Sequence, residues 1–142
     1  MVSRQSEEYV ERRLREWLKR KGYVTLRSPR VFIDVSGEFL EHKPDIFSMK
    51  EKSFFAIECK GLQHKKRKFS NQELYLMVGQ ALYYKEFLKC HVYLAIPFHG
   101  GKEGLPSNIK GLIKVLKSID IGLIMVNDNK INVLLSPEGF LL

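Results

Sequence analysis

One stretch decides the fold of this chain: Pro44-Asp45-Ile46-Phe47, followed by Ser53-Phe54-Phe55-Ala56-Ile57-Glu58-Cys59-Lys60. Both halves are rich in strand-forming residues, and the charged residues 49–52 between them read as a turn, so the pattern predicts a β-hairpin. The two-residue period of a strand sends Glu58 and Lys60 to one face and Ile57 and Cys59 to the other, against the core. The same hairpin returns Asp45 beside Glu58.

Two neighbouring carboxylates on a basic protein indicate a bound cation, because each raises the pKa of the other unless a counter-ion intervenes. Oxygen ligands favour Mg²⁺ or Mn²⁺. Each residue also has a structural alternative. Asp45 after Pro44 fits a turn, and Glu58 with Lys60 fits the solvated face of an antiparallel strand.

Outward from the hairpin, helices and strands alternate. We expect helices at 5–21 (capped by Ser6), 72–88 and from a Ser107 cap onward, and strands at 23–27, 92–96, 121–126 and 131–135. Residues 31–35 form either a short strand of their own or a continuation of 23–27, and 36–38 read as a turn. Such mixing indicates an α/β fold, a central mixed sheet flanked by helices, in one domain over 1–142.

Composition narrows the class of protein. The chain has 142 residues, 44% of them hydrophobic, which is typical of a globular domain and not of a disordered one. It lacks an apolar run long enough to cross a bilayer and an apolar signal segment, so we expect an intracellular, cytoplasmic protein. Its 24 Lys and Arg against 16 Asp and Glu leave a net charge of +8, which favours polyanionic partners.

Pro44-Asp45 followed by Glu58-Cys59-Lys60 matches the PD-(D/E)-x-K signature, so the chain resembles the restriction-endonuclease-like nucleases. Its first 60 residues also look like archaeal Holliday junction resolvases, in which a helix glutamate, here Glu11, completes the acidic site. The resemblance implies a restriction-endonuclease-like core and a Mg²⁺- or Mn²⁺-dependent DNA endonuclease acting on double-stranded or branched DNA. Asp45, Glu58 and the Cys59 backbone carbonyl would bind the metal, with Glu11 reaching it directly or through water.

The resemblance also assigns residues around that site. Lys60 would orient the attacking water or stabilise the transition state. Gln80 and Tyr84 look like the Q-x-x-x-Y motif of RecB-like exonucleases, which implies a catalytic role for Gln80 and a DNA contact for Tyr84. This motif makes an exonuclease one alternative, and an inactive DNA-binding protein of the same fold is another. We expect a homodimer, since cutting two strands calls for two symmetric sites, with the tail 139–142 either at the dimer interface or over the chain's own core. Basic residues expected to contact DNA phosphates are Arg27, Arg30, Lys65, Lys66, Arg67 and Lys68.

Overall fold

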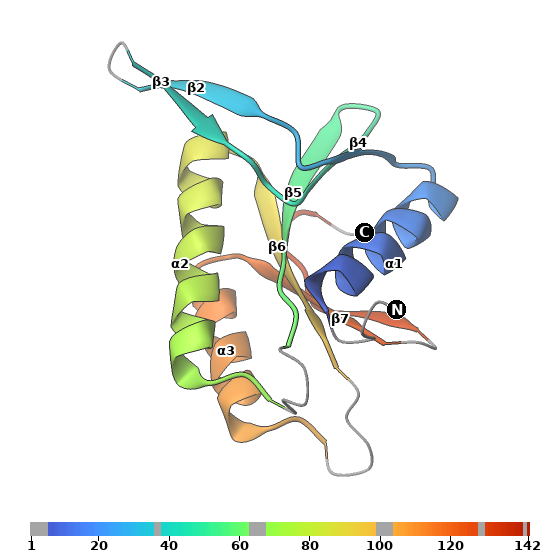
Figure 1. Cartoon of the computed structure of the whole chain (residues 1–142), viewed down its shortest axis with the longest axis vertical. Helices are drawn as coiled ribbons and strands as arrows, with labels where there is room; N and C mark the ends of the chain where they lie inside the picture. Colours follow the sequence, from blue (N-terminus) through green and yellow to red (C-terminus); the bar gives the residue numbers. More distant parts are fainter. Residues whose placement is uncertain (1–5, 36–37, 63–67, 99–103, 128–129, 141) are drawn as a thin grey trace.

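The computed structural model describes residues 6–35, 38–62, 68–98, 104–127, 130–140 and 142, and for 31–35 and 38–42 the backbone alone. Helices and strands follow one another in the mixed order that the sequence predicts (Figure 1). They are α1 (Glu7–Arg20), β1 (Val24–Arg27), β2 (Val31–Val35), β3 (Glu38–His42), β4 (Ile46–Lys50), β5 (Ser53–Cys59), α2 (Asn71–Leu88), β6 (His91–Pro97), α3 (Ser107–Ser118), β7 (Gly122–Val126) and β8 (Ile131–Leu135).

The centre of the molecule is a six-stranded sheet in the order β1-β4-β5-β6-β7-β8. Strands β5, β6 and β7 run parallel, while β1-β4, β4-β5 and β7-β8 pair antiparallel. Helices α2 and α3 cover one face and α1 covers the other (Figure 1). This arrangement confirms the predicted α/β fold with a mixed sheet between helices.

Two hydrophobic cores hold the layers together, one on each face of the sheet. Leu74 of α2, Leu112 of α3 and Leu94 of β6 lie in the first core. Leu14 of α1 and Ile57 of β5 lie in the second, and both are fully buried. Burying a side chain of this size stabilises a fold by about 1.5–3 kcal/mol. Because β5 faces a core on each side, its position is strongly determined, and so is that of the residues at its end.

Of the two predicted helix caps, one is confirmed and one is wrong, and the structure adds a cap that was not predicted. The Ser6 hydroxyl accepts a hydrogen bond from the Tyr9 N–H at 3.1 Å and caps α1. Ser70 caps α2 in a reciprocal capping box. Ser107 was expected to cap α3, but the cap position belongs to Pro106, and Ser107 is the first helical residue. The rigid backbone of Pro106 starts this helix without a side-chain hydrogen bond.

Two predictions of turns need correction, and the structure decides the alternative left open for residues 31–35. Met49 and Lys50, expected in a turn, belong to β4, because that strand pairs with β1 on one side and β5 on the other. Residues 31–35 form a strand of their own, β2, which pairs with an unpredicted strand, β3, in a separate two-stranded sheet. Glu38, expected in a turn, opens β3, while 36–37 lie outside the described residues. The two apolar residues of β3, Phe39 and Leu40, are adjacent, so the segment lacks the alternation by which a strand is predicted.

The apolar residues of α2 do not all face the core. Leu82 is 37% exposed, although Leu74, Met77 and Ala81 of the same helix are buried. Leu76 and Tyr83 of this helix are also exposed, so apolar residues lie on both sides of α2 and periodicity alone does not select the buried side.

The C-terminal segment packs on the α1 side of the sheet. Phe140 is 8% exposed and belongs to that core, with its ring 5.1 Å from the ring of Phe55. The Tyr93 hydroxyl donates to the Phe140 carbonyl at 3.4 Å. Of the two expectations for the tail, Phe140 therefore follows the second, since it covers the chain's own core. Within the described residues, no helix combines the length and apolar character needed to span a membrane.

Candidate metal centre

The β4–β5 hairpin brings Asp45, Glu58 and Lys60 together, as the sequence predicts. Ile46 pairs with Ile57, and continuing this register by one residue places Asp45 opposite Glu58. The backbone N–H of Cys59 donates to Asp45 Oδ2 at 2.8 Å. Lys60 Nζ lies 3.3 Å from Glu58 Oε1. The hairpin alone thus assembles two carboxylates and one ammonium at the carboxyl end of β5.

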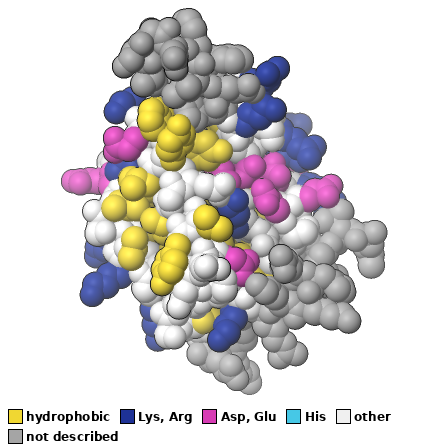
Figure 2. Space-filling view, turned by 60° about the vertical axis from the view of Figure 1, so that its left-hand side comes forward, with side chains coloured by type: hydrophobic (Ala, Val, Ile, Leu, Met, Phe, Trp, Pro, Cys, Tyr) yellow, Lys and Arg dark blue, Asp and Glu magenta, His cyan; other side chains and the backbone are white. Residues whose placement is uncertain are grey.

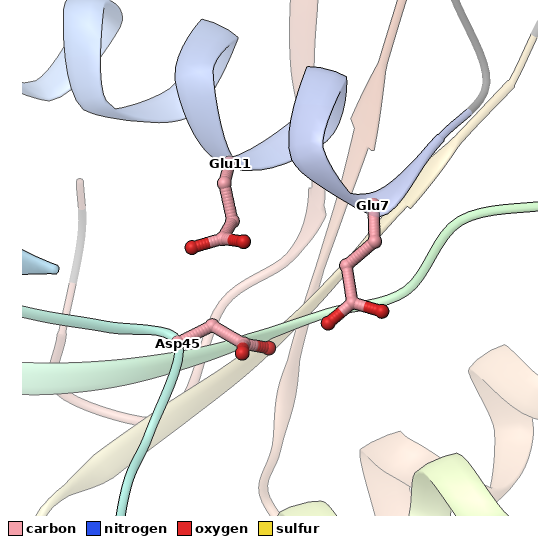
Figure 3. Close-up of side chains that lie close together, drawn as sticks. All are labelled: Glu7, Glu11 and Asp45. Carbon is pink, nitrogen blue, oxygen red and sulfur yellow. The ribbon is translucent and has the colours of Figure 1, made fainter. Parts of the chain in front are cut away.

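Helix α1 adds acidic side chains from the other layer of the fold. Glu7 and Glu11 lie one turn apart on the same helix face, and both point toward Asp45 (Figure 3). Each of the three offers an oxygen, and these oxygens all lie within 4.8 Å of one another. Val10 and Leu14, both fully buried, fix α1 against the sheet and so fix this approach.

Glu7 is a site residue that the sequence interpretation missed. The available signal was its four-residue spacing from Glu11, which places both carboxylates on one face of a helix. Burial raises the pKa of Glu7, Asp45 raises it further, and Lys60 opposes the change.

Two carboxylate oxygens of the site are buried without a partner. Glu11 Oε1 and Glu58 Oε2 have no hydrogen-bond partner among the residues that the structure describes. Glu58 is only 4% exposed and Glu11 only 9%. Leaving such an oxygen unsatisfied costs about 1–3 kcal/mol, and more when it is charged. Oxygens of this kind, gathered around Asp45, fit a hard divalent cation.

Burial and mutual repulsion disfavour the charged forms of the acids in the site. Burial raises the pKa of Glu58 to about 8, with the Asp45 charge adding to the rise and Lys60 opposing it. Burial and Asp45 also raise the pKa of Glu11, which the positive charge of Arg27 partly lowers again. For Asp45, burial raises the pKa, although hydrogen bonds and Lys60 oppose the shift. A bound cation would favour the charged forms of these carboxylates.

Cys59 has only its main chain to offer the site. Its side chain is fully buried in the core on the α1 side, where burial raises the pKa of the thiol well above its usual range. The buried thiol does not reach the site, and the role predicted for the Cys59 backbone carbonyl as a metal ligand stays a prediction.

Gln80 and Tyr84 lie one turn apart on α2 and line one groove with Lys43 and Tyr83. The Tyr84 hydroxyl donates to the Lys43 carbonyl at 3.1 Å, and Gln80 is exposed. Burial, together with the negative charges of Glu58 and Asp45, raises the pKa of Tyr84 to about 12. The groove therefore adjoins the acidic site, and the roles predicted for Gln80 and Tyr84 stay predictions.

Of the predicted basic residues, Arg27 is the one that the described part of the chain places beside the site. It is exposed at the end of β1 and close enough to Glu11 to affect its pKa. Arg30 and Lys68 are exposed. Lys65, Lys66 and Arg67 lie outside the described residues. Figure 2 shows a group of acidic side chains next to a band of hydrophobic ones, with basic side chains nearby.

Comparison with known proteins points to one family. The family model described as archaeal Holliday junction resolvase (hjc) matches residues 2–118. A solved structure of an XisH family protein from Nostoc punctiforme is similar in fold, with 17% sequence identity, a TM-score of 0.54, and coverage of 83% of this chain and 90% of that one. No curated protein matches the chain.

Proposed function

Because the chain belongs to the archaeal Holliday junction resolvase (hjc) family, a family of nucleases, we propose that it is a metal-dependent endonuclease that hydrolyses phosphodiester bonds in branched DNA. One observation supports this most: Glu11 and Glu58 each hold a buried, unpartnered oxygen in the site that Asp45 shares, and Lys60 stands beside Glu58. The carboxylate oxygens would bind a cation, and the Lys60 ammonium would contact a phosphate or an attacking water.

Asp45, Glu58 and the Cys59 carbonyl would hold Mg²⁺ or Mn²⁺, with Glu11 reaching the ion directly or through water. When bound, such an ion polarises a phosphoryl oxygen and lowers the pKa of a water ligand. The Cys59 N–H donates to Asp45 Oδ2 and so orients this carboxylate toward the site. Burial of Glu58 limits bulk water around its carboxylate, which strengthens each electrostatic interaction there.

Lys60 supplies the fixed positive charge of the site. Its ammonium is held 3.3 Å from Glu58 Oε1, on the same strand end as the acids. From there it would donate a hydrogen bond to the attacking water, or to a phosphoryl oxygen on which negative charge develops. Because it is placed before substrate arrives, little reorganisation is needed during the reaction.

DNA contacts come from outside the acidic cluster. Arg27, Arg30 and the basic segment 65–68 would contact phosphates on either side of the cleaved one. Gln80 and Tyr84 would contact the strand where the α2 groove adjoins the acids. We propose a homodimer, because a two-fold axis places two such sites on the two strands of a symmetric junction.

Cleavage of a four-way junction beside a matched linear duplex tests the function, with Mg²⁺, Mn²⁺ or EDTA present. We expect metal-dependent cleavage of the junction. Asp45→Asn and Glu58→Gln should each lower the rate about 1,000-fold or more, because losing a metal ligand removes several kcal/mol of transition-state stabilisation. Glu86→Gln, at an exposed carboxylate on α2, is the matched control and should cleave like the wild type.

Two results would lead to a different functional assignment for this protein. Junction binding without cleavage in either metal would identify an inactive DNA-binding protein of this fold. Cleavage of linear DNA from its ends, with closed circular DNA left intact, would identify an exonuclease.

A further inference from the structure

We propose that Tyr84 is a positioning residue for Asp45: through its hydrogen bond to the Lys43 carbonyl, helix α2 holds the short segment that carries this carboxylate. The inference rests on the proposed function, in which Asp45 is a metal ligand. It concerns the Tyr84 hydroxyl, which donates to the main chain, whereas the DNA contact proposed above concerns the groove that Tyr84 lines.

Asp45 lies just outside the strand ladder that fixes its neighbours. Strand β4 begins at Ile46, and its register with β5 starts with the pair Ile46 and Ile57. On the other side of Asp45, strand β3 pairs with β2 in a separate two-stranded sheet. The main sheet therefore holds the chain after Asp45, and the position of the chain before Asp45 depends on other contacts.

Hydrogen bonds from three different elements reach this segment. The backbone N–H of Ser28, after β1, donates to the Asp45 carbonyl at 2.9 Å. The N–H of Cys59, at the end of β5, donates to Asp45 Oδ2 at 2.8 Å. The Tyr84 hydroxyl, from α2, donates to the Lys43 carbonyl at 3.1 Å. Of these three bonds, the one from Tyr84 restrains the chain before Asp45.

The backbone between the Lys43 carbonyl and Asp45 has little freedom to rotate. Pro44, the residue between them, is buried, and its ring fixes its own φ angle at about −65°. A residue that precedes a proline is restricted to extended conformations, which limits Lys43 as well. A displacement of the Lys43 carbonyl therefore moves Asp45 instead of being absorbed by the residue between them.

Tyr84 is itself held in place by the fold. It lies in the C-terminal half of α2, and its ring packs against the first core, between this helix and the sheet. Figure 1 shows the end of β3 beside this half of the helix. The hydroxyl is therefore fixed by the packing of α2, and its hydrogen bond fixes the Lys43 carbonyl relative to the core.

Tyr75 provides the matched control. It lines the same groove as Tyr84, but its side chain is 70% exposed. Tyr75→Phe removes the same chemical group from the same groove and leaves the bond between Tyr84 and the Lys43 carbonyl in place. Leu134→Ala is a second control, because β8 is the far edge of the sheet and a loss of stability there does not alter the contacts of Asp45.

Mn²⁺ titration calorimetry of the whole chain without DNA, together with junction cleavage at saturating Mn²⁺, tests the proposal. We expect Tyr84→Phe to bind Mn²⁺ about three- to tenfold more weakly than the wild type and to lower kcat about tenfold, because small displacements of a catalytic group are costly. KM, and the affinity for a labelled junction in EDTA, should stay within about twofold of the wild-type values. Tyr75→Phe and Leu134→Ala should bind Mn²⁺ like the wild type.

A Mn²⁺ affinity of Tyr84→Phe equal to that of the wild type would overturn the positioning role. If such a variant also binds the junction more weakly in EDTA, the hydroxyl is a DNA contact instead. Equal losses of Mn²⁺ affinity in Tyr84→Phe and Leu134→Ala would also overturn the role, since they would report a general loss of stability.

The proposed function is decided separately. Cleavage by the wild type, with Tyr84→Phe matching it in Mn²⁺ affinity and rate, refutes only the positioning role of Tyr84. Weaker Mn²⁺ binding by Tyr84→Phe, in a protein whose wild type cleaves no DNA, refutes only the nuclease. A wild type that binds no Mn²⁺ refutes both.

Discussion

At the scale of single residues, the acidic site is costly to fold because its carboxylates are buried close together. Glu58 is nearly fully buried next to Asp45, and Lys60 compensates only part of that cost. Residues whose pKa is strongly shifted by burial and a specific neighbour are characteristic of functional sites. Burying Glu58 next to Asp45 therefore lowers the stability of the fold and favours the binding of positive charge at the site.

Glu58 should therefore give the metal-free protein a measurable pH dependence. Its pKa of about 8 in the fold lies above the ordinary value of 4.5, so between these values the folded state holds a proton that the unfolded chain has released. The contribution of Glu58 to stability is full below pH 4.5 and is lost as the pH rises through about 8. Glu58→Gln removes this loss and should stabilise the protein at pH 8 by about 0.5–2 kcal/mol relative to wild type.

Urea denaturation in EDTA at pH 5, 6.5 and 8 measures this effect. The difference between the Glu58→Gln and wild-type free energies of unfolding should grow with pH, while Glu86→Gln should follow the wild type throughout. A difference that is constant from pH 5 to pH 8 would contradict the shifted pKa.

At the scale of elements, helix α1 contributes both to the stability of the fold and to the acidic site. It packs against the sheet through its apolar face and carries Glu7 and Glu11 at its N-terminal half. The Ser6 hydroxyl caps the start of this helix, and the next residue in the sequence, Glu7, is the first carboxylate of the cluster.

Ser6→Ala should destabilise the protein by about 1 kcal/mol, because it leaves the Tyr9 N–H without its acceptor. Ser107→Ala is the matched comparison: this serine makes no capping hydrogen bond, and its replacement should change stability by less than about 0.5 kcal/mol. Thermal and urea unfolding of both variants measures the contrast, and equal effects would refute the assigned cap at one of the two helices.

Phe140→Ala should destabilise the fold by about 3 kcal/mol, since it empties a position among the aromatic residues of the α1-side core. Leu134→Ala, at an exposed position of β8, should cost less than about 1 kcal/mol. Urea unfolding measures both. Sedimentation should show Phe140→Ala in the same oligomeric state as the wild type; dissociation at unchanged stability would instead place Phe140 in an interface.

At the scale of the whole molecule, a net charge of +8 coexists with a cluster of acids. The acids of the site lie where the first turns of α1 meet the start of the β4–β5 hairpin. Under the proposed function, the basic surplus would attract DNA, and the acids would hold the metal.

DNA affinity should consequently fall steeply with salt. We expect log K to decrease linearly with log salt concentration, and Arg27→Gln should make that slope shallower by about 1, because one phosphate contact is lost. Lys117→Gln, at an exposed position on α3, should leave the slope unchanged. Fluorescence anisotropy with a labelled junction in EDTA measures both slopes. Equal slopes for Arg27→Gln and the wild type would exclude a phosphate contact by Arg27.

Local sequence patterns were enough to predict most of the helices and strands of this protein. The helices, the buried strand β6 and the β4–β5 hairpin depend on periodicity and turn chemistry within short segments, so the sequence by itself places Asp45, Glu58 and Lys60 in one cluster. Glu11 required more, since only its resemblance to a family helix singled it out from the neighbouring charges.

The tertiary structure alone decided what depends on contacts between distant segments. It brought Glu7 to Asp45 across two layers, chose which side of α2 is buried and so exposed Leu82, and directed Phe140 into the chain's own core. It also paired β2 with β3 away from the main sheet. Sequence periodicity reports which face of an element is apolar, whereas packing selects the partner of that face, and that selection is a property of the whole fold.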